Sequence, residues 1–281
     1  MGTSMHPATQ GGYPDDFVAG VLADALDHDC RVYGIAGLQG TGKSTLSVQL
    51  AAMASKRALR VVALSIDDFY LGREARRQLG RSVHPLCATR GAPGTHDVAL
   101  ACDVLDALRE GRTTALPRFD KIADDQLPRA QWPLAQGADP GSGPGQALVL
   151  LEGWFLKVPP QDDAELVEPI NALERDEDPH GTWRRWSNDA LARDYPPLWS
   201  RLERLLFLQG PGFDIVPQWR WQQEQTLQAA HPDRKAMTHE QVGRFVRFFE
   251  RVSRQALRTL PGIAERTVRL DAARRPIAQC G

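Results

Sequence analysis

The sequence lacks an excess of charge of either sign, and it contains little cysteine. Its 281 residues include 34 lysines and arginines against 35 aspartates and glutamates, which gives a formal net charge of −1. Because the positive and negative charges are nearly equal in number, they provide no general attraction to nucleic acid or to an anionic membrane. The four cysteines lie at wide spacings that match neither a zinc site nor a small disulfide framework. We therefore expect reduced thiols, a cytoplasmic protein and no nucleic-acid partner.

Long hydrophobic runs are also missing. No window approaches the roughly 18 apolar residues that a membrane-spanning helix needs, and the first residues have no basic start followed by an apolar core. We therefore expect no membrane partner. A chain with 42% hydrophobic residues can bury one large core. This predicts a single domain over residues 1–281, of which residues 1–14 form a flexible arm, and we expect a monomer.

What the sequence does contain is a series of short apolar runs separated by helical patterns. The runs are apolar on both faces, which is typical of parallel strands covered by helices. Two successive runs with a helix between them form a right-handed strand-helix-strand unit. We therefore predict an α/β fold with a central five-stranded parallel sheet flanked by helices, whose strands are Arg31–Gly37, Arg60–Ile66, Gln146–Gly153, Arg204–Gln209 and Arg266–Asp271.

Two loop-rich insertions interrupt this pattern. Residues 82–97 and 116–145 contain much of the proline and glycine. Long loops in a compact domain are usually functional or mobile. The second insertion ends in the segment GADPGSGPG, residues 137–145, which we expect to form a flexible tether.

A glycine-rich segment directly follows the first strand and precedes a helix. The pattern Gly-x-x-x-x-Gly-Lys-Ser from Gly37 to Ser44 is the phosphate-binding loop, or P-loop, in its required context. Its glycines permit positive φ angles, so successive amides point inward and form an anion site. Lys43 is expected to bridge the β- and γ-phosphates, and the Ser44 hydroxyl to bind Mg²⁺. The alternative is a glycine-rich turn with an incidental lysine. We predict instead that the segment binds ATP, through Gly37, Gly40, Thr41, Gly42, Lys43, Ser44 and Thr45.

Acidic residues follow two neighbouring strands at the same edge of the predicted sheet. Asp67 and Asp68 come directly after the second strand, and Glu152 lies at the end of the third. Ligands of open α/β sheets bind beyond the carboxyl ends of the strands, so these acids should face the bound phosphates. We predict that Asp67 is the general base and that Glu152 helps Ser44 to hold the metal. The alternatives are a helix cap or turn residue for Asp67 and a buried acid satisfied by amides for Glu152.

Several motifs together give a resemblance to a known family. The segments GLQGTGKST, LSIDDFYL, RGAPGTHD, LPRFDK, LLEGW and WRWQQE occur in the order seen in the D-glycerate 3-kinase family, a relative of uridine kinase, pantothenate kinase and phosphoribulokinase. The resemblance extends from about Arg31 to Pro276. It implies a P-loop kinase fold and the ATP-dependent phosphorylation of D-glycerate at its 3-hydroxyl.

The resemblance also implies roles for single residues. Asp67 would activate the acceptor hydroxyl, and the segment RGAPGTHD would line the acceptor pocket. A small hydroxy acid needs cations for its carboxylate and acceptors for its hydroxyls. The candidate cations are Arg90, Arg118 and Lys121, and the candidate acceptors are Asp97 and Asp120. For His96, an ordinary hydrogen-bonded loop residue is the alternative. The expected substrate-binding residues are Asp67, Tyr70, Arg90, His96, Asp97, Arg118 and Lys121.

The segment at about 210–236 is expected to be a helical lid. Gln218 stands where the family pattern leads us to expect arginine, so we predict that Arg220 is the catalytic cation that closes over the transferred phosphoryl group. Its alternative is a simple pair with Glu224 at i+4. After Lys121 the chain also departs from the plant members of the family, which have a glycine-rich basic segment, and Arg129 is a candidate substitute.

Two further patterns favour structural roles. Arg244, Arg247, Arg251, Arg254 and Arg258 form a stripe on a long predicted helix, which we interpret as a solvated basic face. The aromatic residues between 183 and 199 are expected to pack in the core. Two other functions stay open: a kinase for pantothenate, a nucleoside or a sugar phosphate, and a nucleotide-hydrolysing switch.

Overall fold

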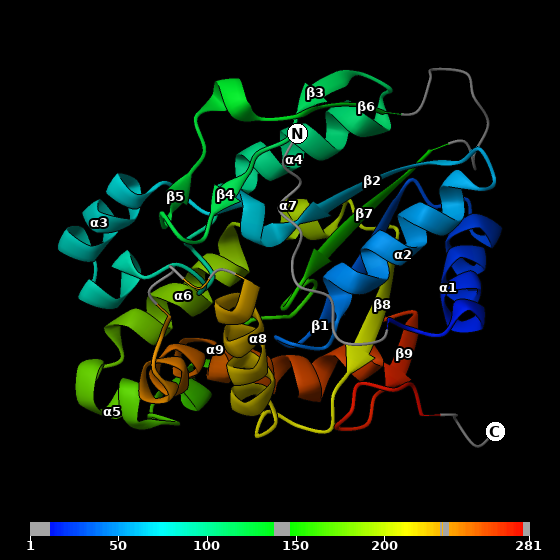
Figure 1. The fold of residues 1–281 in the computed structure, drawn as a ribbon. Coiled ribbons are helices and arrows are strands. Elements are labelled where there is room, and N and C mark those ends of the chain that lie inside the picture. Colours follow the sequence, from blue (N-terminus) through cyan, green and yellow to red (C-terminus); the bar gives the residue numbers. More distant parts are fainter. Residues whose placement is uncertain (1–11, 138–146, 231, 233–235, 278–281) are drawn as a thin grey trace.

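The structure, a computed structural model, describes residues 12–137, 147–230, 232 and 236–277. A five-stranded parallel sheet with the strand order β2-β7-β1-β8-β9 lies at its centre (Figure 1). The predicted α/β fold with five parallel strands is confirmed, and each predicted strand ends within two residues of an observed one. The strands are β1 (Val32–Gly37), β2 (Arg60–Ser65), β7 (Ala147–Gly153), β8 (Arg204–Gln209) and β9 (Arg266–Arg269).

Helices cover both faces of this sheet, which explains why its strands are apolar throughout. Tyr33 and Ile35 of β1 pack with α1 (Asp15–Asp27) and α2 (Lys43–Ser55). Val32 and Ala36 point to the opposite face and belong to a larger core. Helices that contribute to this larger core are α4 (Val98–Arg109), α5 (Ala172–Glu177), α6 (Thr182–Arg193), α7 (Pro196–Trp199) and α9 (His239–Thr259).

The loop-rich insertions contain more regular structure than the sequence indicated. The first follows α3 (Arg73–Ser82). The second insertion, together with the three residues before it, forms two small antiparallel ladders, one of which is a hairpin beside the carboxyl edge of the main sheet (Figure 1). The predicted tether lies outside the described residues except for Gly137. The ladders pair β3 (Thr113–Ala115) with β6 (Leu134–Gln136) and β4 (Phe119–Asp120) with β5 (Asp125–Gln126).

The segment expected to be a lid contains helix α8 (Val216–Ala230), which packs against α9. Helix α9 begins with a capping box, in which Thr238 and Gln241 each accept a hydrogen bond from the other's backbone amide. None of the helices in the described part of the chain combines the length and apolar character needed to cross a bilayer.

The flexible arm expected over residues 1–14 does not extend to Tyr13, which is fixed against the domain. Tyr13 is only 7% exposed, and its backbone exchanges two hydrogen bonds with the Gln49 side chain of α2. The Tyr13 hydroxyl donates to the Thr41 carbonyl oxygen in the P-loop. The aromatic ring provides buried area that holds this stretch against the domain. Residues 1–11, the remainder of the expected arm, lie outside the described residues.

The interpretation of the arginine stripe on α9 as a solvated face holds for Arg244, Arg247, Arg254 and Arg258, which are exposed, and is corrected for Arg251. All five arginines are paired with acids. Arg251 is buried, and its guanidinium lies 2.6 Å from the buried Glu174 carboxylate and 2.8 Å from the carbonyl oxygens of Glu165 and Glu168. Arg244, Arg251 and Arg258 pair with acids of segment 165–177, and this long-range pairing has no signature in the helical pattern of α9 itself.

We predict that Arg251→Met lowers the free energy of unfolding by about 3–5 kcal/mol, because it leaves Glu174 charged and buried without its partner. Arg244→Met is the matched control on the same helix, since Arg244 and Glu177 form an exposed pair worth less than about 1 kcal/mol. Urea unfolding of both variants measures the difference. Equal losses of unfolding free energy in the two variants would show that the buried Arg251 pair stabilises the fold no more than the exposed Arg244 pair.

His96 occupies an aromatic cluster at the carboxyl edge of the sheet. The centroid of its ring lies 4.5 Å from that of Tyr70 and 5.5 Å from that of Phe155. Its Nδ1 lies 2.7 Å from the Tyr195 hydroxyl, and its Nε2 has no hydrogen-bond partner among the described residues. Burial lowers the pKa of His96 to about 3, although the nearby Asp67 carboxylate opposes this shift. The imidazole is therefore neutral at physiological pH.

This shift predicts a pH-dependent stability. Between pH 6.5 and 3 the unfolded chain binds a proton at His96 that the folded chain does not, so stability falls as the pH falls. His96→Asn removes this term. The gap in unfolding free energy between the wild type and the variant should therefore shrink by about 2 kcal/mol from pH 7.5 to 5.0. Urea unfolding at both pH values tests this, and a constant gap would contradict it.

Candidate active site

The P-loop connects β1 to α2 and curls tightly at its glycines. Gly40 and Gly42 have φ angles of 86° and 91°, which favour glycine. A Cβ at Gly40 would lie 2.6 Å from the Trp219 Cβ, so the loop and α8 are in close contact. Lys43 begins α2, and its ammonium donates to the carbonyl oxygens of Gly37 at 2.7 Å and Leu38 at 3.1 Å. The cation is thus held at the loop whose amides form the anion site.

Two acids lie close to this lysine. Burial lowers the pKa of Lys43, and the charges of Glu152 and Asp67 oppose the shift. Glu152 is only 7% exposed and ends β7, which lies between β1 and β2. Its Oε1 accepts a hydrogen bond of 2.7 Å from the Ser44 hydroxyl. A hydroxyl and a carboxylate at this distance are oxygen ligands of the type that Mg²⁺ prefers, so the residues fit the metal expected there.

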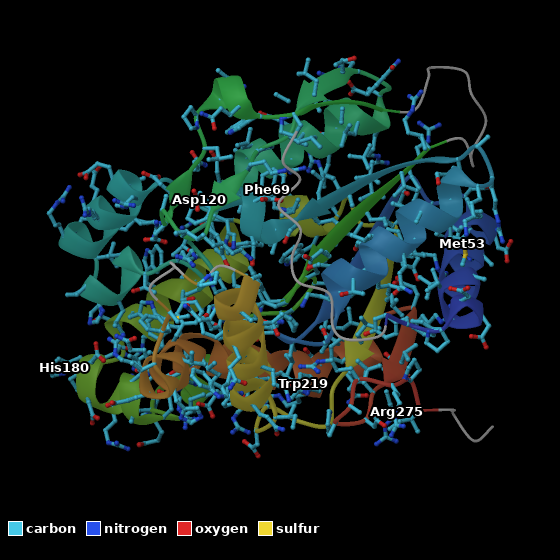
Figure 2. The ribbon with its side chains drawn as sticks, viewed as in Figure 1. Met53, Phe69, Asp120, His180, Trp219 and Arg275 are labelled. Carbon is cyan, nitrogen blue, oxygen red and sulfur yellow. The ribbon has the colours of Figure 1, made fainter. Side chains whose placement is uncertain are left out.

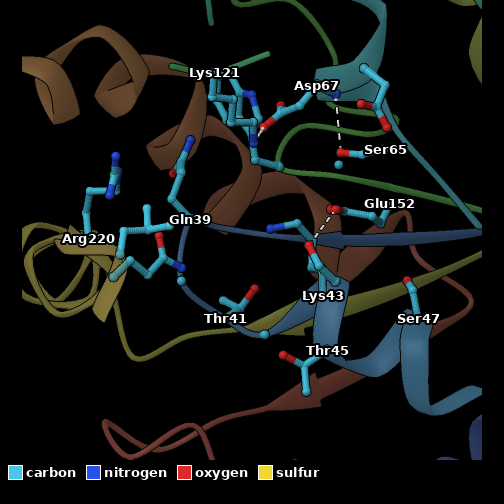
Figure 3. Close-up of a pocket in the computed structure, with 18 of the residues that line it drawn as sticks. Gln39, Thr41, Lys43, Thr45, Ser47, Ser65, Asp67, Lys121, Glu152 and Arg220 are labelled. Carbon is cyan, nitrogen blue, oxygen red and sulfur yellow. Dashed lines mark hydrogen bonds and ion pairs between the residues drawn. The ribbon is translucent and has the colours of Figure 1, made fainter. Parts of the chain in front are cut away.

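Asp67 lies in the short 3₁₀ turn Ile66–Phe69 that follows β2. Both of its carboxylate oxygens have partners: Oδ1 accepts from the Tyr70 hydroxyl at 2.9 Å, and Oδ2 accepts from the Lys121 ammonium at 2.7 Å. Burial alone would raise the pKa of Asp67, but Lys121 and the Tyr70 hydroxyl outweigh it and hold the pKa well below its ordinary value. Figure 3 shows Asp67 with Lys121 on one side of the site and Glu152 with Lys43 on the other.

Asp68 connects this turn to the β4–β5 hairpin. Its carboxylate lies 3.4 Å from both the Arg118 guanidinium and the Phe119 backbone nitrogen. Burial raises its pKa to about 6, although Arg118 and Lys121 act in the opposite direction. The contacts give Asp68 a structural part in placing the hairpin beside Asp67.

The three cations expected to bind the acceptor lie on this hairpin or beside it. Lys121 pairs with Asp67, and Arg118 contacts Asp68. Arg90 pairs with Asp124 and lies over the Phe119 ring at 5.5 Å. The structure therefore brings Arg90, Arg118 and Lys121 together with Asp67 and Tyr70.

The structure places two expected acceptor residues elsewhere. The His96 side chain lies in the aromatic cluster, bound to Tyr195 rather than directed to the cavity. The Asp97 carboxylate accepts from the Leu100 backbone amide at 2.9 Å and so caps α4. The expectation that they line the acceptor pocket is therefore corrected. An aspartate directly before a helix satisfies an otherwise unpaired amide there, which explains its position.

Arg220 lies on the side of α8 that faces the site. Its guanidinium lies 3.2 Å from the buried Glu224 carboxylate, the i+4 pair considered as its alternative. It also lies 5.9 Å from the centroid of the Phe245 ring on α9. Arg220 lines the same cavity as Lys43 (Figure 3). Arg220 therefore reaches the cavity while it is paired with Glu224.

Two P-loop contacts were missed at the sequence level. The Tyr13 hydroxyl binds the Thr41 carbonyl oxygen. Arg274 donates from Nε to the Gly40 carbonyl oxygen at 2.6 Å and lies 5.0 Å from the centroid of the Trp219 ring. Nothing in the sequence singled out these two side chains.

All of these elements surround one cavity of about 2800 Å³. Its wall includes the P-loop, Asp67, the hairpin, Arg220 and the segment after β9. Asp120 of the hairpin and Arg275 of that segment both line it, although they lie far apart in the molecule (Figure 2). The cavity is thus long enough to bring a nucleotide and a second substrate to the carboxyl edge of the sheet.

Known proteins resemble the chain in sequence. No protein-family model matches it. The uncharacterized kinase mug58 of Schizosaccharomyces pombe is 32% identical over 226 residues, which cover 78% of each chain. The chloroplastic D-glycerate 3-kinase of Arabidopsis thaliana is 32% identical over 159 residues, 52% of this chain and 33% of that protein.

A solved structure supports the fold. The D-glycerate 3-kinase of Cryptococcus neoformans has a TM-score of 0.77 and 24% identity, with 95% of this chain and 99% of that chain covered. The P-loop, the parallel sheet and these similarities lead to one conclusion. The chain belongs to the D-glycerate 3-kinase family of P-loop kinases and is an ATP-dependent phosphotransferase that acts on an alcohol group.

Proposed function

We propose that this kinase transfers the γ-phosphoryl group of ATP to the 3-hydroxyl of D-glycerate and forms 3-phosphoglycerate. One observation carries the proposal: the carboxylate of Asp67 lies in the same cavity wall as the P-loop and pairs with Lys121, and Arg118 and Arg90 line the same cavity beside the neighbouring acids Asp68 and Asp124. A small hydroxy acid needs one carboxylate acceptor for its hydroxyl proton and cations for its own carboxylate. The relatives named D-glycerate 3-kinase support the choice of this acid.

ATP would bind at the P-loop, whose amides form an anion site at the start of α2. The Lys43 ammonium now binds the carbonyl oxygens of Gly37 and Leu38, and phosphate oxygens would replace or join these partners. Ser44 and Glu152 would hold Mg²⁺, which supplies charge that neutralises the polyphosphate. Tyr13 and Arg274 fix the loop from two sides, so it is organised before the nucleotide arrives.

In the transfer step, the 3-hydroxyl oxygen attacks the γ-phosphorus. A bond forms between these atoms, and the bond from the γ-phosphorus to the oxygen that bridges it to the β-phosphorus breaks, which leaves ADP. The hydroxyl proton passes to the Asp67 carboxylate. Tyr70 holds this carboxylate through a hydrogen bond of 2.9 Å and so directs it toward the acceptor.

The remaining parts of the proposal concern the lid and the assembly. Residues 210–236 would close over the site and exclude water, because water in the same place would hydrolyse ATP. Arg220 would then stabilise the charge on the transferred group. We propose one catalytic domain over residues 1–281 that acts as a cytoplasmic monomer on a small molecule, without a nucleic-acid or membrane partner.

An acceptor screen tests the proposed function. We expect ATP turnover with D-glycerate to exceed that with L-glycerate, pantothenate, uridine or ribulose 5-phosphate. Three cations line the cavity that also contains the base, which favours a small carboxylate over a neutral or larger acceptor. Coupled detection of ADP measures the rates. A preference for another acceptor, or turnover that no acceptor changes, would contradict the proposal.

The proposed base predicts the effect of one substitution. Asp67→Asn should lower kcat with D-glycerate by roughly 10²–10⁴-fold, because the amide cannot take the hydroxyl proton. ATP should still bind, since the P-loop is unchanged, and calorimetry checks this. Asp163→Asn makes the same chemical change at an exposed site and should have no effect. Normal turnover in Asp67→Asn would remove the assignment.

A further inference from the structure

The Asp67 carboxylate has no unengaged oxygen in this structure. Tyr70 occupies Oδ1, and the Lys121 ammonium occupies Oδ2 at 2.7 Å. An acceptor hydroxyl must donate its proton to one of these oxygens if Asp67 is the base. The ion pair with Lys121 also holds the pKa of Asp67 well below its ordinary value, which makes the carboxylate a weak base while the pair is intact.

Lys121 lies on a hairpin whose turn is fixed by hydrogen bonds and ion pairs, and its side chain is on the cavity wall. The Asp120 carboxylate accepts from the backbone amides of Ile122 and Ala123 at 2.8 and 2.9 Å and so shapes the turn. Asp124 anchors the same turn through ion pairs with the buried Arg76 and with Arg90. The Lys121 side chain itself is 40% exposed and lines the cavity. Its ammonium can therefore change partners while its backbone stays in place.

We propose that Lys121 is a specificity-determining residue that keeps Asp67 engaged until the carboxylate of an acceptor takes the lysine away. A neutral polyol of the same size has a hydroxyl but no group that competes for the ammonium. An acid brings both, so its carboxylate releases the base that its own hydroxyl needs. The enzyme then selects anionic acceptors in two ways: they bind more tightly, and only they release Asp67 from Lys121 so that it can act as the base. This inference rests on the proposed role of Asp67.

The same device limits the hydrolysis of ATP. Water has no carboxylate, so a water molecule beside the γ-phosphate meets a base that is still paired with Lys121. Lys121 and Lys43 line the same cavity, so Lys121 lies on the wall of the space where the phosphates would bind. Any anion that draws Lys121 away therefore acts directly beside the reacting groups.

Lys121→Gln distinguishes two roles of Lys121: control of the base Asp67, and binding of the substrate carboxylate alone. In both cases we expect the variant to lose activity with D-glycerate. Only the control of Asp67 by Lys121 leads us to expect a gain of activity in the variant, because Asp67 is then free of its ion pair. Hydrolysis of ATP without an acceptor and phosphorylation of glycerol should each rise by roughly tenfold over the wild type. Lys56→Gln is the matched control at an exposed site away from the cavity and should behave as the wild type.

A second measurement uses the unmodified protein and does not depend on the folding of a variant. Propionate has a carboxylate but no hydroxyl, and we expect it to raise the turnover of ATP with glycerol several-fold in the wild type. It should have no such effect in Lys121→Gln, where the lysine is already absent. ADP release measures both reactions, and the Lys56→Gln control should respond to propionate as the wild type does.

The outcomes distinguish this inference from the proposed function. If D-glycerate is phosphorylated but propionate has no effect and Lys121→Gln gains no activity, the inference is wrong and the function stands. The same conclusion holds if ATP alone releases the base, which would make hydrolysis equal in the wild type and the variant. If propionate activates the wild type but D-glycerate is not an acceptor, the inference is supported and the proposed acceptor is wrong.

Discussion

The structure depends on the position of β1 between β7 and β8 in the parallel sheet. This position brings the P-loop, which follows β1, beside Glu152 at the end of β7, and β2 on the other side of β7 adds Asp67. The register pairs Glu152 with both Ile35 and Ser65, so three strand ends meet at one edge. The buried charges at this edge are tolerated because each of them contacts an opposite charge or a hydrogen-bond partner.

The contacts around the P-loop extend this arrangement to both ends of the chain. Tyr13 contacts Thr41 from 28 residues before it, and Arg274 contacts Gly40 from 234 residues after it. Helix α8 adds Trp219, which packs directly on Gly40. A tight backbone curl with positive φ angles is costly by itself, and these contacts from three separate segments hold it in a form that can receive phosphates.

The sequence predicted the parts of this site that follow from local rules. A glycine pattern between a strand and a helix identified the P-loop, and parallel strands that end at one edge placed Asp67 and Glu152 beside it. The sequence did not predict which role a versatile side chain takes: Asp97 caps α4 instead of lining the cavity. The burial of Arg251 could not be predicted either, because it depends on Glu174, 77 residues away. Contacts of this range are decided by tertiary packing.

The central claim is that the acid at the end of β2 faces the γ-phosphate and takes the proton of the acceptor. The most direct test is a crystal structure of the protein with a non-hydrolysable ATP analogue, Mg²⁺ and D-glycerate. The account predicts the 3-hydroxyl oxygen of the acid at about 3 Å from the Asp67 carboxylate and in line with the γ-phosphorus. A hydroxyl bound away from Asp67, on another wall of the cavity, would contradict it.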